Sequence, residues 1–347
     1  MKLGSLRLVL AVAAAKGWFL KQIDVNTAFL HGNLDEEVYM KPPQGLDVKA
    51  GQVCKLEKSL YGLKQVSRQW NTKLKSVLVE LGFVQSKADY SLFTKQTEFG
   101  FTALLVYVDD LILAGNDLGE INAVKTVLND RFKIKDIGDL KFFIGMEVAR
   151  LKEGILLNQR KYAMDILKDA GFENCKLLLS LWTTLSQYLD HPTTSHLSAV
   201  HRILRYIKAS PATGIVFSTT SDLCVTGFAN SNWAACPDSR RFVTAYYFYI
   251  GTSLVSWKSK KQVTVACSSA EAEYRALATA TKEAIWLSFI LKDLGMPPPS
   301  PLAPTVTANL QFTSPPTRCC GHSDQTAASV HILHTLWQVK TGQLTHS

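Results

Sequence analysis

Two adjacent carboxylates between two apolar segments have the clearest chemical potential in this chain. The segment Phe101-Thr-Ala-Leu-Leu-Val-Tyr-Val-Asp-Asp-Leu-Ile-Leu-Ala predicts two β-strands, and Asp109 and Asp110 stand where the strands meet. Side chains alternate between the faces of a strand, so a regular strand would direct one of these acids inward. A buried carboxylate is costly unless it is paired or bound to a metal. A tight turn that presents both acids to a cation removes that cost.

A third acid, Asp24, has the same setting, because it ends the apolar strand expected over residues 18–25. Carboxylates bind Mg²⁺, which also prefers water and phosphate oxygens, and Mn²⁺ is the alternative cation. Two such ions about 3.5–4 Å apart can activate a 3′-hydroxyl and stabilise a leaving pyrophosphate. The other interpretation of residues 109–110 is a plain hairpin turn with solvent-exposed Asp residues.

Four sequence blocks resemble the reverse transcriptases of copia-type retrotransposons, in that family's order, over residues 3–176. The blocks begin Gln22-Ile-Asp-Val-Asn-Thr-Ala-Phe-Leu-His, Ser59-Leu-Tyr-Gly-Leu-Lys-Gln, Tyr107-Val-Asp-Asp and Asp136-Ile-Gly-Asp-Leu-Lys. The resemblance implies that Asp24, Asp109 and Asp110 are the catalytic acids. Asp24 and Asp109 would be the main metal ligands, and Asp110 a supporting carboxylate.

Three more residues are candidate contacts to nucleic acid. Lys64 and Arg68 would touch phosphates of the template or nucleotide, and a solvated helix face is the alternative. The resemblance implies that Tyr107 packs near the primer end, whereas a core strand aromatic is the alternative. The implied partners are RNA and DNA as template and primer, and the implied reaction adds deoxynucleotides to the primer 3′-end.

Residues 195–295 resemble the ribonuclease H region of the same family. The blocks are His196-Leu-Ser-Ala-Val-His-Arg, Trp233-Ala-Ala-Cys-Pro-Asp, Ser256-Trp-Lys-Ser-Lys-Lys-Gln and Ser268-Ser-Ala-Glu-Ala-Glu-Tyr. The family carries two Asp residues before the Trp, where this chain has Asn230 and Asn232. A carboxamide cannot supply the charge that holds a catalytic cation.

The remaining acids of that region are Glu273, which matches the family's helix carboxylate, and its neighbour Glu271. The family's next acidic motif is replaced by a Pro-rich stretch. Asn230, Asn232, Glu271 and Glu273 therefore predict a degenerate, inactive ribonuclease H site. An exposed acidic turn of a helix is the alternative interpretation of the two Glu residues.

The predicted fold class is α+β. We expect a reverse transcriptase palm and partial thumb over residues 1–175, a shortened connection at 176–194 and a ribonuclease H-like α/β domain at 195–295. A poorly ordered Pro/Ser/Thr-rich tail is expected at 296–347. In this family a fingers segment precedes the first block, and we expect that segment to be missing here. We therefore expect an incomplete palm in a truncated and largely inactive copy. The alternatives are a non-catalytic nucleic-acid-binding remnant and a pseudogene product.

Composition agrees with a nucleic-acid partner, because the 347 residues carry a formal net charge of +9. A slightly basic soluble surface is the alternative. The seven cysteines are scattered, with no CxxC pair, and favour a reducing compartment over disulfides or a zinc site. Residues 8–15 form an apolar run that resembles a short signal peptide. We interpret the run as a helix over residues 6–15. This interpretation predicts a cytoplasmic or nuclear location and no membrane partner. We predict no specific protein partner.

Overall fold

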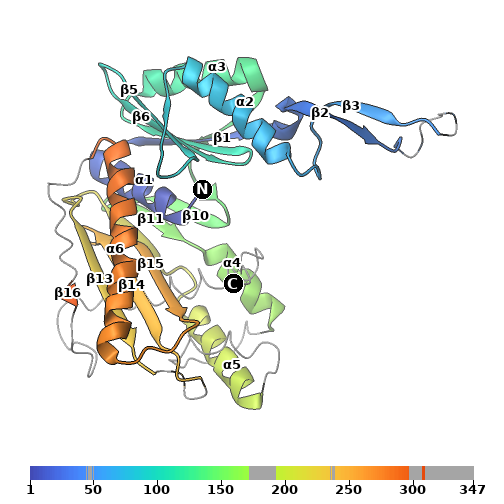
Figure 1. Ribbon diagram of the computed structural model, residues 1–347. Helices are drawn as coiled ribbons and strands as arrows, with labels where there is room; N and C mark the ends of the chain where they lie inside the picture. The colour runs from blue at the N-terminus through green and yellow to red at the C-terminus, as the bar shows by residue number, and fades with distance from the viewer. Residues whose placement is uncertain are drawn as a thin grey trace. The chain divides into compact units, whose positions relative to one another are not determined.

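The computed structural model describes residues 1–43, 45, 49, 51–171, 193–234, 236, 239–296 and 307–308. The expected connection at 176–194 and tail at 296–347 therefore fall largely outside the described residues. The chain folds into two compact units (Figure 1). Of the described residues, the first unit takes 1–9, 17–140 and 289–296, and the second takes 10–16, 141–288 and 307–308. Both combine helices with largely antiparallel sheets, which confirms the expected mixture of the two.

The first unit is built on a six-stranded antiparallel sheet in the order β4-β5-β6-β7-β1-β8. Its strands are β4 (Val84–Gln85), β5 (Leu92–Gln96), β6 (Phe101–Tyr107), β7 (Asp110–Gly115), β1 (Phe19–Val25) and β8 (Ile134–Asp139). The hairpin expected from the alternating and β-branched residues around 101–114 is therefore present as β6 and β7. β1 pairs with β7 on one side and β8 on the other, so it lies inside the sheet.

Two helices share one hydrophobic core with this sheet. They are α2 (Val66–Glu80) and α3 (Leu118–Phe132), and each carries an apolar stripe at intervals of three or four residues. The Asp117 side chain accepts hydrogen bonds from the first turn of α3 and so starts that helix. Alternate residues of the three central strands join the same core: Ile23, Val25, Leu104, Val106, Leu111 and Leu113. The residues between them consequently point to the other face of the sheet.

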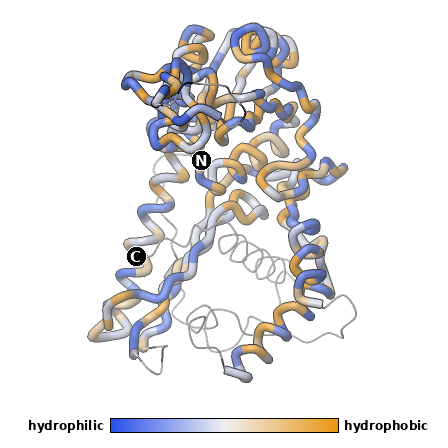
Figure 2. The backbone as a smooth tube through the Cα atoms, turned by 90° about the vertical axis from the view of Figure 1, so that its right-hand side faces the viewer, coloured by the Kyte–Doolittle hydropathy of each residue, from blue (hydrophilic) through white to orange (hydrophobic). Residues whose placement is uncertain are grey.

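Two smaller elements complete the first unit, and the N-terminal helix belongs to it only in part, since residues 10–16 fall in the second unit. A two-stranded ribbon of β2 (Asn33–Met40) and β3 (Cys54–Lys58) extends beyond the main sheet (Figure 1). The short 3₁₀ helix η1 (Ala28–His31) links β1 to this ribbon. The expected N-terminal helix is present as α1 (Leu3–Lys16), whose largely apolar course is visible next to the N-terminus in Figure 2. No helix in the described part of the chain is long and apolar enough to cross a membrane.

The second unit contains two four-stranded sheets. The first has the order β12-β11-β10-β9, from β9 (Phe142–Phe143), β10 (Met146–Arg150), β11 (Gly154–Asn158) and β12 (Gly214–Ser218). Helices α4 (Arg160–Asp169) and α5 (Thr194–Ala209) pack together through a small apolar cluster. Thus β12 and α5, expected in the ribonuclease H-like region, associate with β11 and α4 of the expected palm and thumb region.

The second sheet has the order β15-β14-β13-β16, with β13 (Val225–Asn232), β14 (Val243–Ile250), β15 (Ser253–Lys261) and β16 (Thr307–Ala308). The long helix α6 (Ser269–Asp293) follows β15 and contacts the sheet, since the Ser256 hydroxyl donates to Glu283 at 2.6 Å. The two sheets also touch, because the Ser253 hydroxyl donates to the Val216 carbonyl at 3.0 Å.

Candidate active site

The two adjacent acids lie at the tight turn between β6 and β7. Tyr107 pairs with Asp110 across the hairpin, which leaves Val108 and Asp109 as the two turn residues. Val108 has a φ of +57°, in the left-handed region. A positive φ at the first turn position is a feature of the primed turns that suit a two-residue hairpin, and Gly or Asn usually supplies it. A β-branched residue is rare there, so neighbouring contacts must hold this turn.

Strand register brings the third acid to the same place. Asp24 of β1 stands directly opposite Asp110 of β7. Residues directly opposite in an antiparallel pair have Cβ atoms about 4.5–5.5 Å apart. The neighbours Ile23 and Leu111 belong to the core shared with α2 and α3. Because side chains alternate, Asp24 and Asp110 both lie on the sheet face away from those helices.

Asp109 adjoins this pair through its backbone. Its carbonyl accepts a hydrogen bond from the Val25 N–H at 2.9 Å, so the turn is bonded to the end of β1. All three acids are half-buried. We expect the Asp24 and Asp109 carboxylates to lie about 4–7 Å apart, close enough to share a cation.

The electrostatics of Asp110 indicate crowded negative charge. Burial raises the pKa of this carboxyl, the charges of Asp109 and Asp24 raise that pKa further, and a hydrogen bond from Gln22 opposes the rise. The Gln22 Nε2 donates to Asp110 Oδ1 at 3.4 Å, from two residues before Asp24 on the same face of β1. A bound cation would relieve the repulsion among the three carboxylates.

These oxygen donors suit a hard divalent cation such as Mg²⁺ or Mn²⁺. In the part of the chain that the structure describes, no three His, Cys, Asp or Glu side chains are arranged as a complete metal-ligand set. Mg²⁺ commonly takes only one or two carboxylates and fills its shell with water and substrate phosphates. Asp24 and Asp110 therefore fit such a site by their chemistry and by their place on one sheet face, and Asp109 by its chemistry and its place in the adjoining turn.

Trp70 of α2 supports the turn from the core side, a contact that the sequence did not reveal. The indole ring is buried, and its Nε1 donates to the Val108 carbonyl at 2.6 Å. The ring packs edge-on against Phe132 with centroids 5.1 Å apart, and the His31 ring lies 6.1 Å away. In the sequence, Trp70 stands five residues after the end of the second family block.

The first and second family blocks also meet. The buried Ser59 hydroxyl donates to the Phe29 carbonyl, and the Ser59 N–H donates to the Gly32 carbonyl at 3.2 Å. A Cβ on Gly32 would come within 2.8 Å of the Ser59 hydroxyl oxygen, so only glycine allows this approach. Tyr61 packs on Phe29 with ring centroids 4.4 Å apart. These contacts fix η1 directly after the strand that carries Asp24.

The three candidate nucleic-acid contacts have different settings. Lys64 lies in the turn before α2 and Arg68 in its first turn, and both side chains are exposed. Exposure suits phosphate contact and equally suits the solvated helix face that we gave as the alternative. Tyr107 is half-buried and shares the acid face with its partner Asp110. It also lines a cavity of about 530 Å³ beside the turn, together with Val108 and Trp70.

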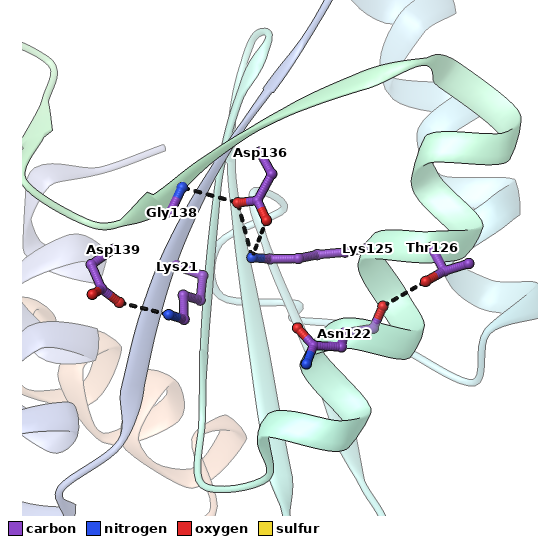
Figure 3. A network of polar contacts seen from close by, with 7 residues as sticks. All are labelled: Lys21, Asn122, Lys125, Thr126, Asp136, Gly138 and Asp139. Atoms are coloured by element: carbon purple, nitrogen blue, oxygen red, sulfur yellow. Dashed lines mark hydrogen bonds and ion pairs between the residues drawn. The ribbon is translucent and has the colours of Figure 1, made fainter.

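The fourth family block holds β8 in place (Figure 3). Asp136 accepts two hydrogen bonds from the Lys125 ammonium of α3, at 2.8 and 2.9 Å, and one from the Gly138 N–H at 2.9 Å. The hydrogen bond from Lys125 is the main cause of the lowered pKa of Asp136. Lys21 of β1 forms an ion pair with Asp139 at 2.7 Å. The block therefore ties β8 to α3 and to the strand of Asp24.

In the second unit, strand register places the two Asn residues of the predicted ribonuclease H site on one face of the sheet. Asn230 pairs with Ala245 and Asn232 with Val243, which places both on the face of Phe228 and its partner Tyr247. The intervening residue of β14, Tyr246, points to the other face. Glu283 of α6 contacts Tyr246 on that other face. Burial is the main cause of the raised pKa of Tyr246, and the charge and hydrogen bond of Glu283 raise that pKa further.

The two Glu residues lie in the first turns of α6. Glu271 accepts a hydrogen bond from the Cys267 N–H at 2.7 Å and forms an ion pair with Arg275 at 2.7 Å. The backbone hydrogen bond from Cys267 is the main cause of the lowered pKa of Glu271. Glu271 thus stabilises the start of the helix. Glu273, two residues further along the helix, is half-buried.

Comparison with known proteins gives the family. The family profile described as "Reverse transcriptase (RNA-dependent DNA polymerase)" matches residues 1–180. The "Retrovirus-related Pol polyprotein from transposon RE1" of Arabidopsis thaliana is 35% identical over 339 residues, which cover 85% of this chain and 23% of that protein. The polyprotein from transposon TNT 1-94 of Nicotiana tabacum is 33% identical in an alignment 349 positions long, gaps included, which covers 85% of this chain and 26% of that protein. The chain thus spans about a quarter of the length of these relatives. Because the family profile covers more than half of the chain, the chain belongs to the copia-type reverse transcriptase family.

Proposed function

We propose that the first unit is the palm of an RNA-directed DNA polymerase from a copia-type retrotransposon. The observation that carries the proposal is the register of Asp24 opposite Asp110, beside the turn of Asp109. This register puts the Asp24 and Asp110 carboxylates on the sheet face away from α2 and α3, next to the turn that carries Asp109. Family membership alone would not assign these acids, because the chain spans only about a quarter of its polyprotein relatives.

The proposed roles follow from these positions. Asp24 and Asp109 would hold Mg²⁺ or Mn²⁺, and Asp110 would support them. When bound, such ions lower the pKa of the primer 3′-hydroxyl and neutralise charge on the leaving pyrophosphate. Tyr107, next to the cavity beside the turn, would pack against the primer end. Lys64 and Arg68 would contact backbone phosphates of the RNA or DNA template-primer.

The second unit is proposed to carry a ribonuclease H-like fold whose catalytic site is degenerate. Two neutral side chains, Asn230 and Asn232, replace acids that the family uses, and Glu271 is engaged in the start of α6. We keep the assignment of residues 1–175 to palm and thumb and of 195–295 to this domain. In this proposal β12, from the second of these ranges, pairs with β11, from the first. The proposed location of the protein is the cytoplasm or the nucleus.

The test is primer extension by the purified chain on a primed RNA template, with Mg²⁺ or Mn²⁺, beside the Asp109→Asn variant. We expect little processive synthesis, but any extension should be lost in the variant. Equal extension by both proteins would contradict the assignment of the acids. No extension, together with salt-sensitive binding of the template-primer, would favour a non-catalytic nucleic-acid-binding role, which the net charge of +9 supports.

A further inference from the structure

The turn that carries Asp109 adopts a conformation that its own residues disfavour. Val108 has a φ of +57° and carries two methyl groups on its Cβ, which crowd the backbone in the left-handed region. Its side chain is 40% exposed, so core packing of that side chain does not fix the backbone. Something else must keep the turn in this state, because strained conformations persist only where the surroundings over-determine them.

Three hydrogen bonds hold the turn from two directions. From β1, the Val25 N–H donates to the Asp109 carbonyl at 2.9 Å, and Gln22 donates to the Asp110 carboxylate at 3.4 Å. From α2, the Trp70 indole donates to the Val108 carbonyl at 2.6 Å. The Trp70 bond is the shortest of the three and the only one that reaches the peptide plane between Val108 and Asp109.

The Trp70 ring is a rigid donor. It is 2% exposed and lies in the core between α2 and the sheet, where Phe132 packs edge-on against it. An indole has a single N–H and no acceptor, so its whole hydrogen-bonding capacity goes to this carbonyl. The orientation of the Val108–Asp109 peptide plane in turn sets the direction in which the Asp109 side chain points.

We propose that Trp70 is a positioning residue of the polymerase site: its indole N–H fixes the Val108–Asp109 peptide plane and thereby directs the Asp109 carboxylate toward Asp24. The proposal rests on the proposed function, since it assigns Asp109 as a metal ligand. Trp70 itself touches no reacting atom. It acts by making a strained turn the stable one.

The discriminating variant is Trp70→Phe in the full chain, which keeps a six-membered aromatic ring in the core and removes the N–H together with the five-membered ring. The matched control is Trp18→Phe. Trp18 is also buried, and its ring stacks on Phe101 with centroids 5.2 Å apart. It lies just before the start of β1, whereas Asp24 lies near the other end of that strand. Both variants lose ring area, and only Trp70→Phe frees the turn.

The first readout is Mn²⁺ binding to the full chain, followed by the paramagnetic resonance of the free ion. We expect Trp70→Phe to weaken Mn²⁺ binding about fivefold to tenfold while Trp18→Phe leaves it within about twofold, with misplacement of a ligand as the cause. Equal Mn²⁺ binding by wild type and Trp70→Phe overturns the proposal, and this includes the case in which neither protein binds the ion.

The second readout is rescue. In Trp70→Phe/Val108→Gly, glycine adopts the left-handed turn without strain, so the turn no longer needs the clamp. We expect the double variant to recover Mn²⁺ binding to within about threefold of wild type. If Trp70 matters only for core packing, Val108→Gly will not restore binding, and that result overturns the proposal.

Primer extension separates this proposal from the proposed function. Where wild type extends a primer, Trp70→Phe should lower kcat about tenfold to a hundredfold and change the nucleotide KM less than about threefold. Where wild type does not extend a primer but Trp70→Phe still weakens Mn²⁺ binding with rescue by Val108→Gly, the polymerase assignment fails and the positioning of Asp109 stands.

Discussion

Replacement of Asp110 by Asn should stabilise the fold while it impairs the site. Asp110 is directly opposite Asp24 and one residue from Asp109, so the wild-type sheet holds three negative charges together. Burial and these two charges raise the pKa of Asp110, which means that its ionised form is disfavoured in the folded state. Asn has nearly the same shape and carries no charge, and it can still accept a hydrogen bond from Gln22.

The expected gain is modest because the site is partly open to solvent. Like charges directly opposite in a sheet destabilise it by about 0.2–1 kcal/mol. Solvent screening keeps the value in that range for a half-buried carboxylate. For a unit of this size, about 0.5–1 kcal/mol corresponds to a rise of roughly 1–4 °C in the unfolding midpoint.

The pH dependence has a definite sign. Since the folded-state pKa of Asp110 lies above its ordinary value of 3.8, the folded protein binds this proton more readily than the unfolded chain. The destabilisation of the fold by the ionised Asp110 carboxylate is therefore fully present above the raised pKa. It disappears as pH falls below the ordinary pKa of the carboxyl. The advantage of Asp110→Asn should be largest at neutral pH and vanish in that acidic window.

The measurement is urea unfolding of wild type and Asp110→Asn across this pH range, with Asp136→Asn as the control of opposite sign. Hydrogen bonds from Lys125 and the Gly138 N–H lower the pKa of Asp136, so its charge stabilises the fold at neutral pH. Asp136→Asn should cost about 0.5 kcal/mol there, and less as pH falls through the lowered pKa. Destabilisation by Asp110→Asn at neutral pH, or a gain that does not shrink in acid, would refute the reasoning.

Four further outcomes are expected. Gly115→Ala should destabilise the first unit by about 1–3 kcal/mol in urea unfolding, because the new Cβ would come within 2.6 Å of the Phe101 carbonyl oxygen. Glu271→Gln should lower the thermal midpoint of the second unit, since it weakens the bonds to Cys267 and Arg275. Asn230→Asp alone should leave the purified chain unable to cleave an RNA–DNA hybrid above the wild-type background. Binding of a primed RNA template should weaken about tenfold or more between roughly 50 and 200 mM salt, as counterion release requires.

The hairpin and its acids could be predicted from sequence because their signals are local. Alternating and β-branched residues around Asp109 and Asp110 define two strands and a turn within fifteen positions. The same alternation correctly indicates that Asp24 and Asp110 lie on the sheet face away from α2 and α3 once β1 is known to pair with β7. That pairing joins segments far apart in the chain, so the residue pattern alone did not give its register.

Other features depend on such distant contacts entirely. Nothing local to Trp70 indicates that its indole reaches the turn 38 residues later. The pairing of β11 with β12 crosses a boundary that composition and family blocks drew at residue 175, and short strands of this kind carry no partner information. Glu271 could be predicted in part, since Ser268 followed three residues later by Glu is a typical start of a helix.

One register therefore serves both the core and the site. In β1 and β7, Ile23 and Leu111 enter the hydrophobic core while Asp24 and Asp110 leave it, and these four residues alternate without interruption. A slip of one residue would place acids in the core and apolar side chains at the metal position, at a cost of many kcal/mol. The large free energy of core burial thus keeps the like charges of Asp24 and Asp110 close together, although these charges repel each other. The strands can hold the acids together without a bound cation, and only the direction of the turn residue Asp109 is left to weaker, local contacts.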